Sequence, residues 1–159
     1  MTNFEALLAA LARNEVAFIV VGGAAAIAHG SARYTYDLDI VYERTALNME
    51  RLVSALAPYE PYLRGAPPGL PFFWDVRTLA RGLNFTLVTS LGDIDLLGEI
   101  AGGGGYHDLL PNAVALEIFG SPCFALSISQ LIRAKRAAGR PKDFEAIAEL
   151  EAIQEERGE

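Results

Sequence analysis

The chain has 159 residues, a length typical of one globular domain. Hydrophobic residues make up 52% of it and charged residues 21%, which excludes a wholly disordered chain because enough apolar surface is available to offset chain entropy. The formal net charge of −7 argues against a general polyanion-binding surface. We therefore expect no broad nucleic-acid surface, and any phosphate recognition must be local.

Neither a membrane span nor a secretory signal is expected. The longest apolar run, Val16–Ala28, is shorter than the roughly 20 residues of a spanning helix and contains Gly22-Gly23. Glu5 stands where a signal peptide carries positive charge. The single cysteine, Cys123, cannot form an intrachain disulfide. These features predict a soluble cytoplasmic protein without a disulfide framework or structural zinc.

The first half of the chain alternates helical and strand patterns. Apolar spacing predicts a helix over residues 4–13, and the β-branched run 17–21 predicts a central strand buried on both faces. Gly22-Gly23 ends that strand, residues 24–28 predict a short helix, and Gly30 occupies its C-terminal cap region.

A second strand and a long irregular stretch follow. Residues 37–42 alternate with period two, and Thr45 is placed to cap a helix that Pro58 stops. Residues 59–71 carry four prolines and two glycines, a composition that neither a helix nor a central strand accepts. We expect the longest loop of the protein there.

The second half predicts a hairpin, two shorter strands and two C-terminal helices. Ser127 and Gln130 have the spacing of a capping box, and Asp143 is placed to cap the last helix. The expected elements are a helix at 75–81, strands at 84–89 and 93–97 joined by a turn, a flexible loop at 102–105, strands at 114–119 and 124–126, and helices within 127–157. We expect a single domain over residues 1–159, with the helices of 127–157 packed on it.

Asp37 and Asp39 are the first unusual feature. Two carboxylates on one face of a strand have Cα atoms only about 7 Å apart, so their charges repel. A divalent cation would relieve this repulsion, and Mg²⁺ favours one or two carboxylates together with substrate phosphate oxygens. The alternative is that both side chains are exposed and merely solvated.

Gly22-Gly23 is the second feature. A glycine pair at a strand end lets the backbone approach a ligand closely and offers N–H groups to an anion. The pair fits neither the dinucleotide-binding fingerprint nor the P-loop pattern. The alternative is a tight connection between a strand and a helix.

The third feature is Asp93-Ile94-Asp95, a second pair of carboxylates on a predicted strand. A carboxylate from this strand that met Asp37 and Asp39 would complete a two-metal site. In the alternative, Asp93 belongs to the turn and Asp95 is solvated.

In this order the features resemble the polymerase-beta-like nucleotidyltransferase superfamily. The resemblance covers residues 18–150 and includes small bacterial members related to abortive-infection and toxin–antitoxin nucleotidyltransferases. The matching stretches are Val20-Val21-Gly22-Gly23, Ala24–His29, Arg33–Asp39, Asp95, Leu131–Lys135 and Gly139–Asp143. The resemblance implies an α+β fold, with a mixed sheet and helices packed largely on one side.

The resemblance also implies a site and a reaction. Asp37 and Asp39 would hold the metal bound to the nucleoside triphosphate, and both would share a second metal with Asp95. The two ions would be Mg²⁺ or Mn²⁺. Asp95 would accept the proton of a hydroxyl acceptor, and Gly22 and Gly23 would cradle the β- and γ-phosphates.

Three cations are candidate triphosphate contacts: Arg33, Lys135 and Lys142. The alternative for the two lysines is that they complement helix dipoles. One position departs from the family pattern, because many catalytic members carry Ser where this chain has Gly23. Only backbone donors then remain there for the phosphate.

Other polar and aromatic residues have plainer interpretations. His29 is expected to be a helix-end residue without a metal role. Phe72, Phe73 and Trp74 form either a wall for base stacking or part of the core.

The leading functional hypothesis is a Mg²⁺-dependent transferase that moves a nucleoside monophosphate from an NTP to a hydroxyl of RNA, protein or a small molecule. It includes a place in a toxin–antitoxin or phage-defence system and a small helical partner protein. The alternative is a non-catalytic antitoxin or protein-binding partner that keeps the fold. A plain metal-binding regulatory domain ranks last.

Overall fold

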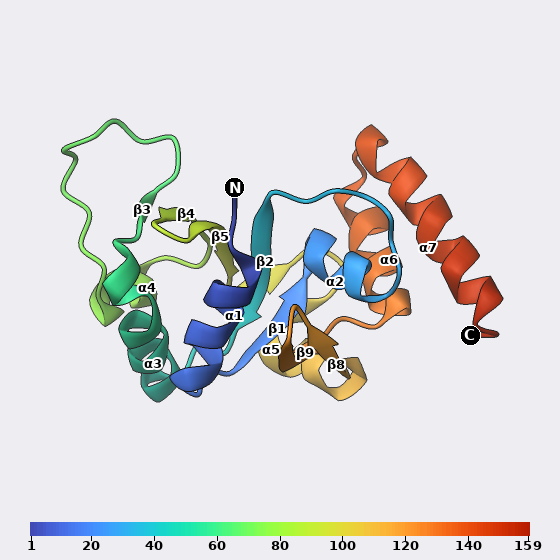
Figure 1. The fold of residues 1–159 in the computed structure, drawn as a ribbon, viewed down its shortest axis with the longest axis horizontal. Helices are drawn as coiled ribbons and strands as arrows, with labels where there is room; N and C mark the ends of the chain where they lie inside the picture. Colours follow the sequence, from blue (N-terminus) through green and yellow to red (C-terminus); the bar gives the residue numbers. More distant parts are fainter.

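A seven-stranded mixed sheet organises the computed structural model, which describes residues 1–159 (Figure 1). The strand order is β3-β4-β5-β2-β1-β9-β8. The strands of this sheet are β1 (Phe18–Val21), β2 (Asp37–Tyr42), β3 (Tyr62–Leu63), β4 (Phe85–Thr89), β5 (Gly92–Leu97), β8 (Val114–Ile118) and β9 (Ser121–Ala125). A second, two-stranded sheet pairs β6 (Glu99–Ile100) with β7 (Gly104–Gly105). The α+β class predicted from the sequence is confirmed.

Seven α-helices and three short 3₁₀ segments complete the fold. The helices are α1 (Phe4–Arg13), α2 (Gly22–Ala28), α3 (Ala46–Leu56), α4 (Val76–Arg81), α5 (Tyr106–Leu109), α6 (Ile128–Ala138) and α7 (Phe144–Glu156), and the 3₁₀ segments are η1 (Ala57–Tyr59), η2 (Leu110–Asn112) and η3 (Pro141–Asp143). None of these helices has the length and apolar character required to cross a lipid bilayer.

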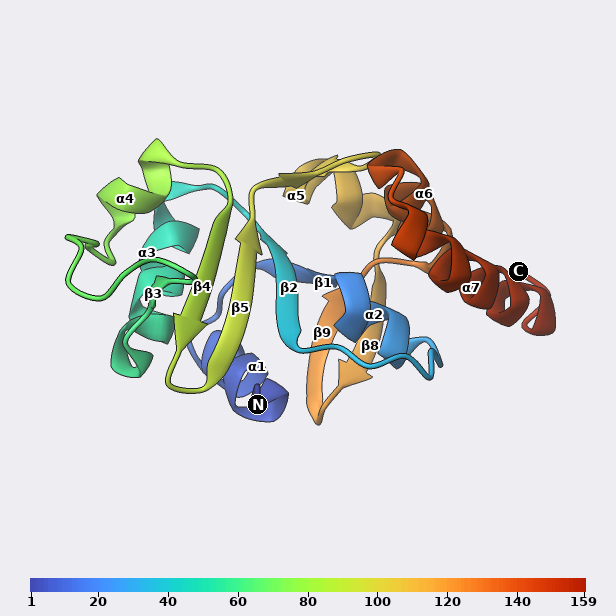
Figure 2. The ribbon, with the colours of Figure 1, turned by 90° about the horizontal axis from the view of Figure 1, so that it is seen from above.

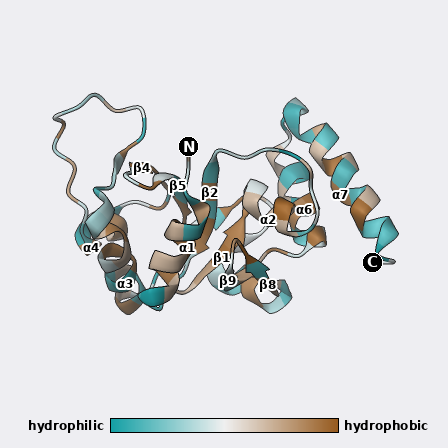
Figure 3. Ribbon diagram, viewed as in Figure 1, coloured by the Kyte–Doolittle hydropathy of each residue, from teal (hydrophilic) through white to brown (hydrophobic).

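Strand β1, inside the sheet, is buried on both faces. All four residues of β1 are buried, and this strand is brown along its length in the hydropathy view (Figure 3). It pairs antiparallel with β2 and parallel with β9, while β2 pairs parallel with β5. The β-branched run therefore forms the buried central strand that its composition predicts.

The half of the sheet formed by β4, β5 and β2 is covered on one face only. Leu87, Ile94 and Leu96 are buried in the same core as Leu52 and Leu56 of α3. The next residues along β4 point to the opposite face and are exposed. In Figure 2 no helix crosses in front of these three strands, and α1 and α3 lie behind them. One sheet face is thus left free for polar side chains.

The last two helices contact the segment around α2. Ser127 and Gln130 form the predicted capping box of α6, with reciprocal side-chain to backbone bonds of 3.2 and 2.9 Å. Glu149 of α7 accepts a hydrogen bond from the Ser31 hydroxyl, with an O···O distance of 2.5 Å. Arg157 donates to the His29 carbonyl at 2.6 Å. These hydrogen bonds therefore connect α7 and its C-terminal cap residue with His29 and Ser31, which follow α2.

Several local expectations differ from the structure. Strand β9 begins at Ser121 rather than at residue 124. Helix α2 begins at Gly22 rather than after the glycine pair. The stretch 59–71 contains β3, which Pro61 permits because β3 is a two-residue edge strand. The loop at 102–105 includes one strand of the β6–β7 hairpin, and helix α5 follows it unpredicted. Asp143 stands at the start of α7 but makes no side-chain cap bond, because its carboxylate faces cations instead.

Candidate metal and nucleotide site

Strand register brings the predicted carboxylates together on the uncovered face of the sheet. In the parallel pair β2–β5, Asp39 lies beside Asp95 and Asp37 lies beside Asp93. All four alternate with buried apolar residues, so their side chains share one face. Carboxylate oxygens of Asp37, Asp39 and Asp95 lie within 4.8 Å of one another. This cluster is the candidate metal site.

Without a metal ion, the carboxylates of the cluster repel one another. Burial raises the pKa of Asp39 to about 8, and the charges of Asp37 and Asp95 add to the effect. Burial also raises the pKa of Asp95, with a further contribution from Asp37. At neutral pH the metal-free site therefore keeps a proton on Asp39.

The donor set fits a hard divalent cation. Asp39 Oδ1 is buried and has no hydrogen-bond partner. A buried carboxylate oxygen without a partner costs free energy, which a metal ligand bond would recover. Three carboxylates at this spacing match the oxygen ligands that Mg²⁺ and Mn²⁺ prefer. The residues present could therefore hold such an ion.

The glycine pair abuts the carboxylates. Gly22 has φ +64°, and a Cβ atom there would lie 2.3 Å from Asp39 Oδ2, so only glycine fits without displacing that carboxylate. A Cβ at Gly23 would lie 2.7 Å from the Thr35 hydroxyl oxygen. The space that a serine at position 23 would need is thus filled by Thr35.

Two cavities adjoin the glycine pair, and cations line both. One, of about 220 Å³, is lined by Gly22 and Asp39 together with Lys135 and Arg140. The remaining lining residues are apolar: Val21, Leu97, Ile100, Ala101, Leu126, Leu131, Ala134 and Ala138. A cavity with apolar walls and a few convergent polar groups is typical of a small-molecule site.

The second cavity, of about 60 Å³, contains two of the three cations predicted from the sequence. Arg33 and Lys135 both line it, together with Gly23. Lys142 lies exposed in η3 and lines neither cavity. Arg33 is also 3.7 Å from the exposed Glu145 carboxylate. The structure therefore places Arg33 and Lys135, but not Lys142, beside the glycine pair.

Asp143 connects two of these cations. Its carboxylate is buried, accepts a 2.7 Å bond from Arg140 Nε and lies 3.8 Å from Lys135 Nζ. Arg140 was not among the predicted site residues, although it lies within the stretch Gly139–Asp143 that carries the family resemblance. The buried carboxylate holds both cations at the wall of the larger cavity.

Arg64 is a residue of the site that sequence reasoning missed. It follows β3 directly, and its guanidinium lies against three of the four carboxylates. The sequence carries no signal for this contact, because Arg64 lies in the expected irregular stretch and meets the cluster only through sheet pairing.

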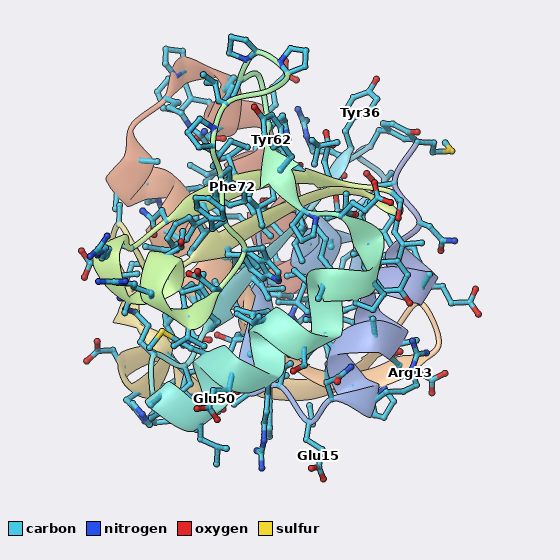
Figure 4. All side chains as sticks on the ribbon, turned by 90° about the vertical axis from the view of Figure 1, so that its left-hand side faces the viewer. Arg13, Glu15, Tyr36, Glu50, Tyr62 and Phe72 are labelled. Atoms are coloured by element: carbon cyan, nitrogen blue, oxygen red, sulfur yellow. The ribbon has the colours of Figure 1, made fainter.

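The structure shows where the predicted aromatic residues and His29 lie. Trp74 packs on the core and donates its indole N–H to the Val53 carbonyl at 2.9 Å. Phe72 forms an edge-to-face pair with Tyr62, and the two side chains lie on the same side of the molecule in Figure 4. Phe73 is exposed. His29 is the C-cap residue of α2, and its Nε2 lies 2.8 Å from the Leu126 carbonyl.

Comparison with known proteins identifies the fold. A solved structure from Thermotoga maritima, described as a putative nucleotidyltransferase, matches this chain with a TM-score of 0.57 and 14% sequence identity. The match covers 90% of this chain and 86% of that chain. No protein-family model matches the sequence, and no curated protein is detectably similar to it. The chain thus shares the fold of that protein, and its acidic cluster lies on the uncovered face of the sheet.

Proposed function

We propose that this protein is a Mg²⁺-dependent nucleotidyltransferase that moves a nucleoside monophosphate from an NTP to a hydroxyl acceptor. The observation that carries the proposal is the cluster of Asp37, Asp39 and Asp95, in which a buried oxygen of Asp39 has no partner. The fold shared with the Thermotoga maritima protein supports it.

Each carboxylate has a distinct role in this proposal. Asp37 and Asp39 would hold the ion that accompanies the triphosphate, and with Asp95 they would hold a second ion. When bound, such ions stabilise the attacking and leaving oxygens of an in-line displacement. Asp95 accepts the proton of the acceptor hydroxyl.

The cavities beside the glycine pair would receive the nucleotide. The backbone of Gly22 and Gly23, which lines the two cavities, would cradle the phosphates in this proposal. Lys135, Arg140 and Arg33 supply the positive charge that a triphosphate requires. The apolar wall of the larger cavity offers contact to the nucleoside.

The test is transfer of label from each of the four NTPs, α-³²P-labelled, with Mg²⁺ and a cell extract as the source of acceptors. We expect label in RNA, protein or a small molecule with the wild type and none with Asp95→Asn. Asp95→Asn should still bind NTP, since Asp37 and Asp39 remain. Glu50→Gln, an exposed change on α3, should transfer normally. Measurable NTP binding without any transfer by the wild type would reject catalysis.

The non-catalytic alternative is favoured by two observations. The Arg64 guanidinium contacts carboxylates that the proposed metals need, and Thr35 occupies the space of a serine at position 23. In that case the chain would bind a partner, such as a small helical protein, without turnover. A toxin–antitoxin or phage-defence role stays a prediction in both cases.

A further inference from the structure

Arg64 reaches the acidic cluster from the far edge of the sheet. Its backbone N–H donates to the Thr86 carbonyl at 3.0 Å, which continues the β3–β4 pairing. Its side chain then crosses β4, where Nη2 donates to the Leu87 carbonyl at 2.7 Å. The guanidinium arrives above β5 and β2. The sheet pairing of β3 therefore positions this cation over the carboxylates.

The guanidinium contacts three of the four carboxylates. Nη2 lies 2.8 Å from Asp95 Oδ1, Nε lies 3.3 Å from Asp93 Oδ2, and Nη1 lies 3.8 Å from Asp37 Oδ2. It does not reach Asp39. Neither Arg64 Nε nor Asp95 Oδ1 completes a hydrogen bond, although both atoms are buried. Charge attraction, more than directed hydrogen bonding, holds Arg64 to these carboxylates.

The carboxylates that Arg64 contacts are of two kinds. Asp37 and Asp95 belong to the proposed metal site, whereas Asp93 does not. A metal ion bound by Asp37 and Asp95 would therefore not compete with Arg64 for Asp93. With Asp39 protonated, three of the four carboxylates remain charged, and one arginine balances only one of these charges. The cluster therefore stays negative and still favours a divalent cation after Arg64 has bound.

We propose that Arg64 is an internal counter-ion that competes with divalent metal for Asp37 and Asp95 and moves off both carboxylates when metal binds. This inference rests on the metal site of the proposed function. Arg64 and a metal ion cannot both contact the same oxygens of these two carboxylates, Asp37 Oδ2 and Asp95 Oδ1. Arg64 thereby sets the metal concentration at which the site fills, and metal binding changes the position of the chain that follows it.

Mn²⁺ affinity measured by isothermal titration is the first test. Arg64→Gln keeps an unbranched polar side chain, shorter than arginine, and removes the charge. It should bind Mn²⁺ about tenfold more tightly, since a neighbouring cation alters carboxylate equilibria by at least this factor. Arg64→Lys should fall between the two proteins. Arg77→Gln, an exposed change on α4 with the same loss of charge, should bind as the wild type does. Circular dichroism of each variant verifies folding.

Tryptic cleavage after Arg64 is the second test and requires no variant. Trypsin must take the arginine side chain into its specificity pocket, and Arg64 is only 28% exposed while it is paired. The following Gly65 has open space around it. Mn²⁺ should therefore accelerate cleavage at this bond, measured by mass spectrometry, without accelerating cleavage after Arg77.

The outcomes separate the two proposals. If the wild type binds Mn²⁺ and Arg64→Gln binds it no more tightly, or more weakly, then Arg64 does not compete and this inference is wrong while the metal site stands. Slower cleavage after Arg64 in Mn²⁺ would also overturn it. If neither protein binds Mn²⁺, both proposals fall. Binding by Arg64→Gln alone would support both.

Discussion

Replacing Asp39 with asparagine should stabilise the metal-free protein at alkaline pH. Asp39 is surrounded by the Asp37 and Asp95 carboxylates, and burial together with their charges raises its pKa to about 8 from 3.8. Asparagine keeps nearly the same shape and carries no charge. The substitution therefore removes the ionisation of one buried group and little else.

The direction in which stability changes with pH follows from proton binding. Between pH 3.8 and about 8 the folded protein keeps a proton on Asp39 that the unfolded chain has released, so stability falls as pH rises through this window. The gap between these values corresponds to about 6 kcal/mol at full ionisation. Asparagine leaves a polar amide where Asp39 Oδ1 has no partner, which costs about 1–3 kcal/mol. We expect Asp39→Asn to be of order 3 kcal/mol more stable than wild type at pH 9, and no more stable than wild type at pH 4.

Urea unfolding in the presence of a chelator, repeated from pH 4 to pH 9, measures this difference. The control is Glu50→Gln, an exposed change that should stay within about 0.5 kcal/mol of wild type throughout. Added Mn²⁺ should stabilise the wild type but not Asp39→Asn. A constant difference between Asp39→Asn and wild type across this pH range would refute the reasoning, since no ionisation would then separate them.

Three further predictions follow from the same geometry. Mn²⁺ binding at pH 7 should release about one proton, because Asp39 must lose its proton to bind the ion. Calorimetry in buffers of different ionisation enthalpy measures this release, and release of no proton would contradict the raised pKa of Asp39. Gly22→Ala should weaken Mn²⁺ binding at least tenfold, since its Cβ would displace Asp39, and unchanged affinity would argue against that contact. The substitution should also lower the free energy of unfolding by about 1–2 kcal/mol, because Gly22 has a positive φ. Asp143→Asn should weaken NTP binding several-fold, because it releases Lys135 and Arg140 from their contacts with the carboxylate. Glu151→Gln, which breaks an exposed ion pair, should not weaken it. Equal effects of the two substitutions would indicate that Asp143 has a purely structural role.

Local patterns in the sequence determined most of the elements and one half of the candidate site. Period-two alternation over residues 37–42 placed Asp37 and Asp39 on one face of β2, because side chains of a strand alternate whatever the strand pairs with. The apolar run of β1 and the capping box at Ser127 were readable for the same reason. Each depends only on neighbours a few residues away in the chain.

The tertiary structure alone decided which distant groups meet. Asp95 joins Asp37 and Asp39 because β5 pairs with β2 in a particular parallel register, and a shift of one residue would turn its side chain to the opposite face. Arg64 meets the cluster because a two-residue edge strand, too short to leave a periodic pattern, pairs with β4. Asp143 turns toward Lys135 instead of capping α7. Such contacts depend on long-range pairing and packing free energies, which no local spacing along the chain encodes.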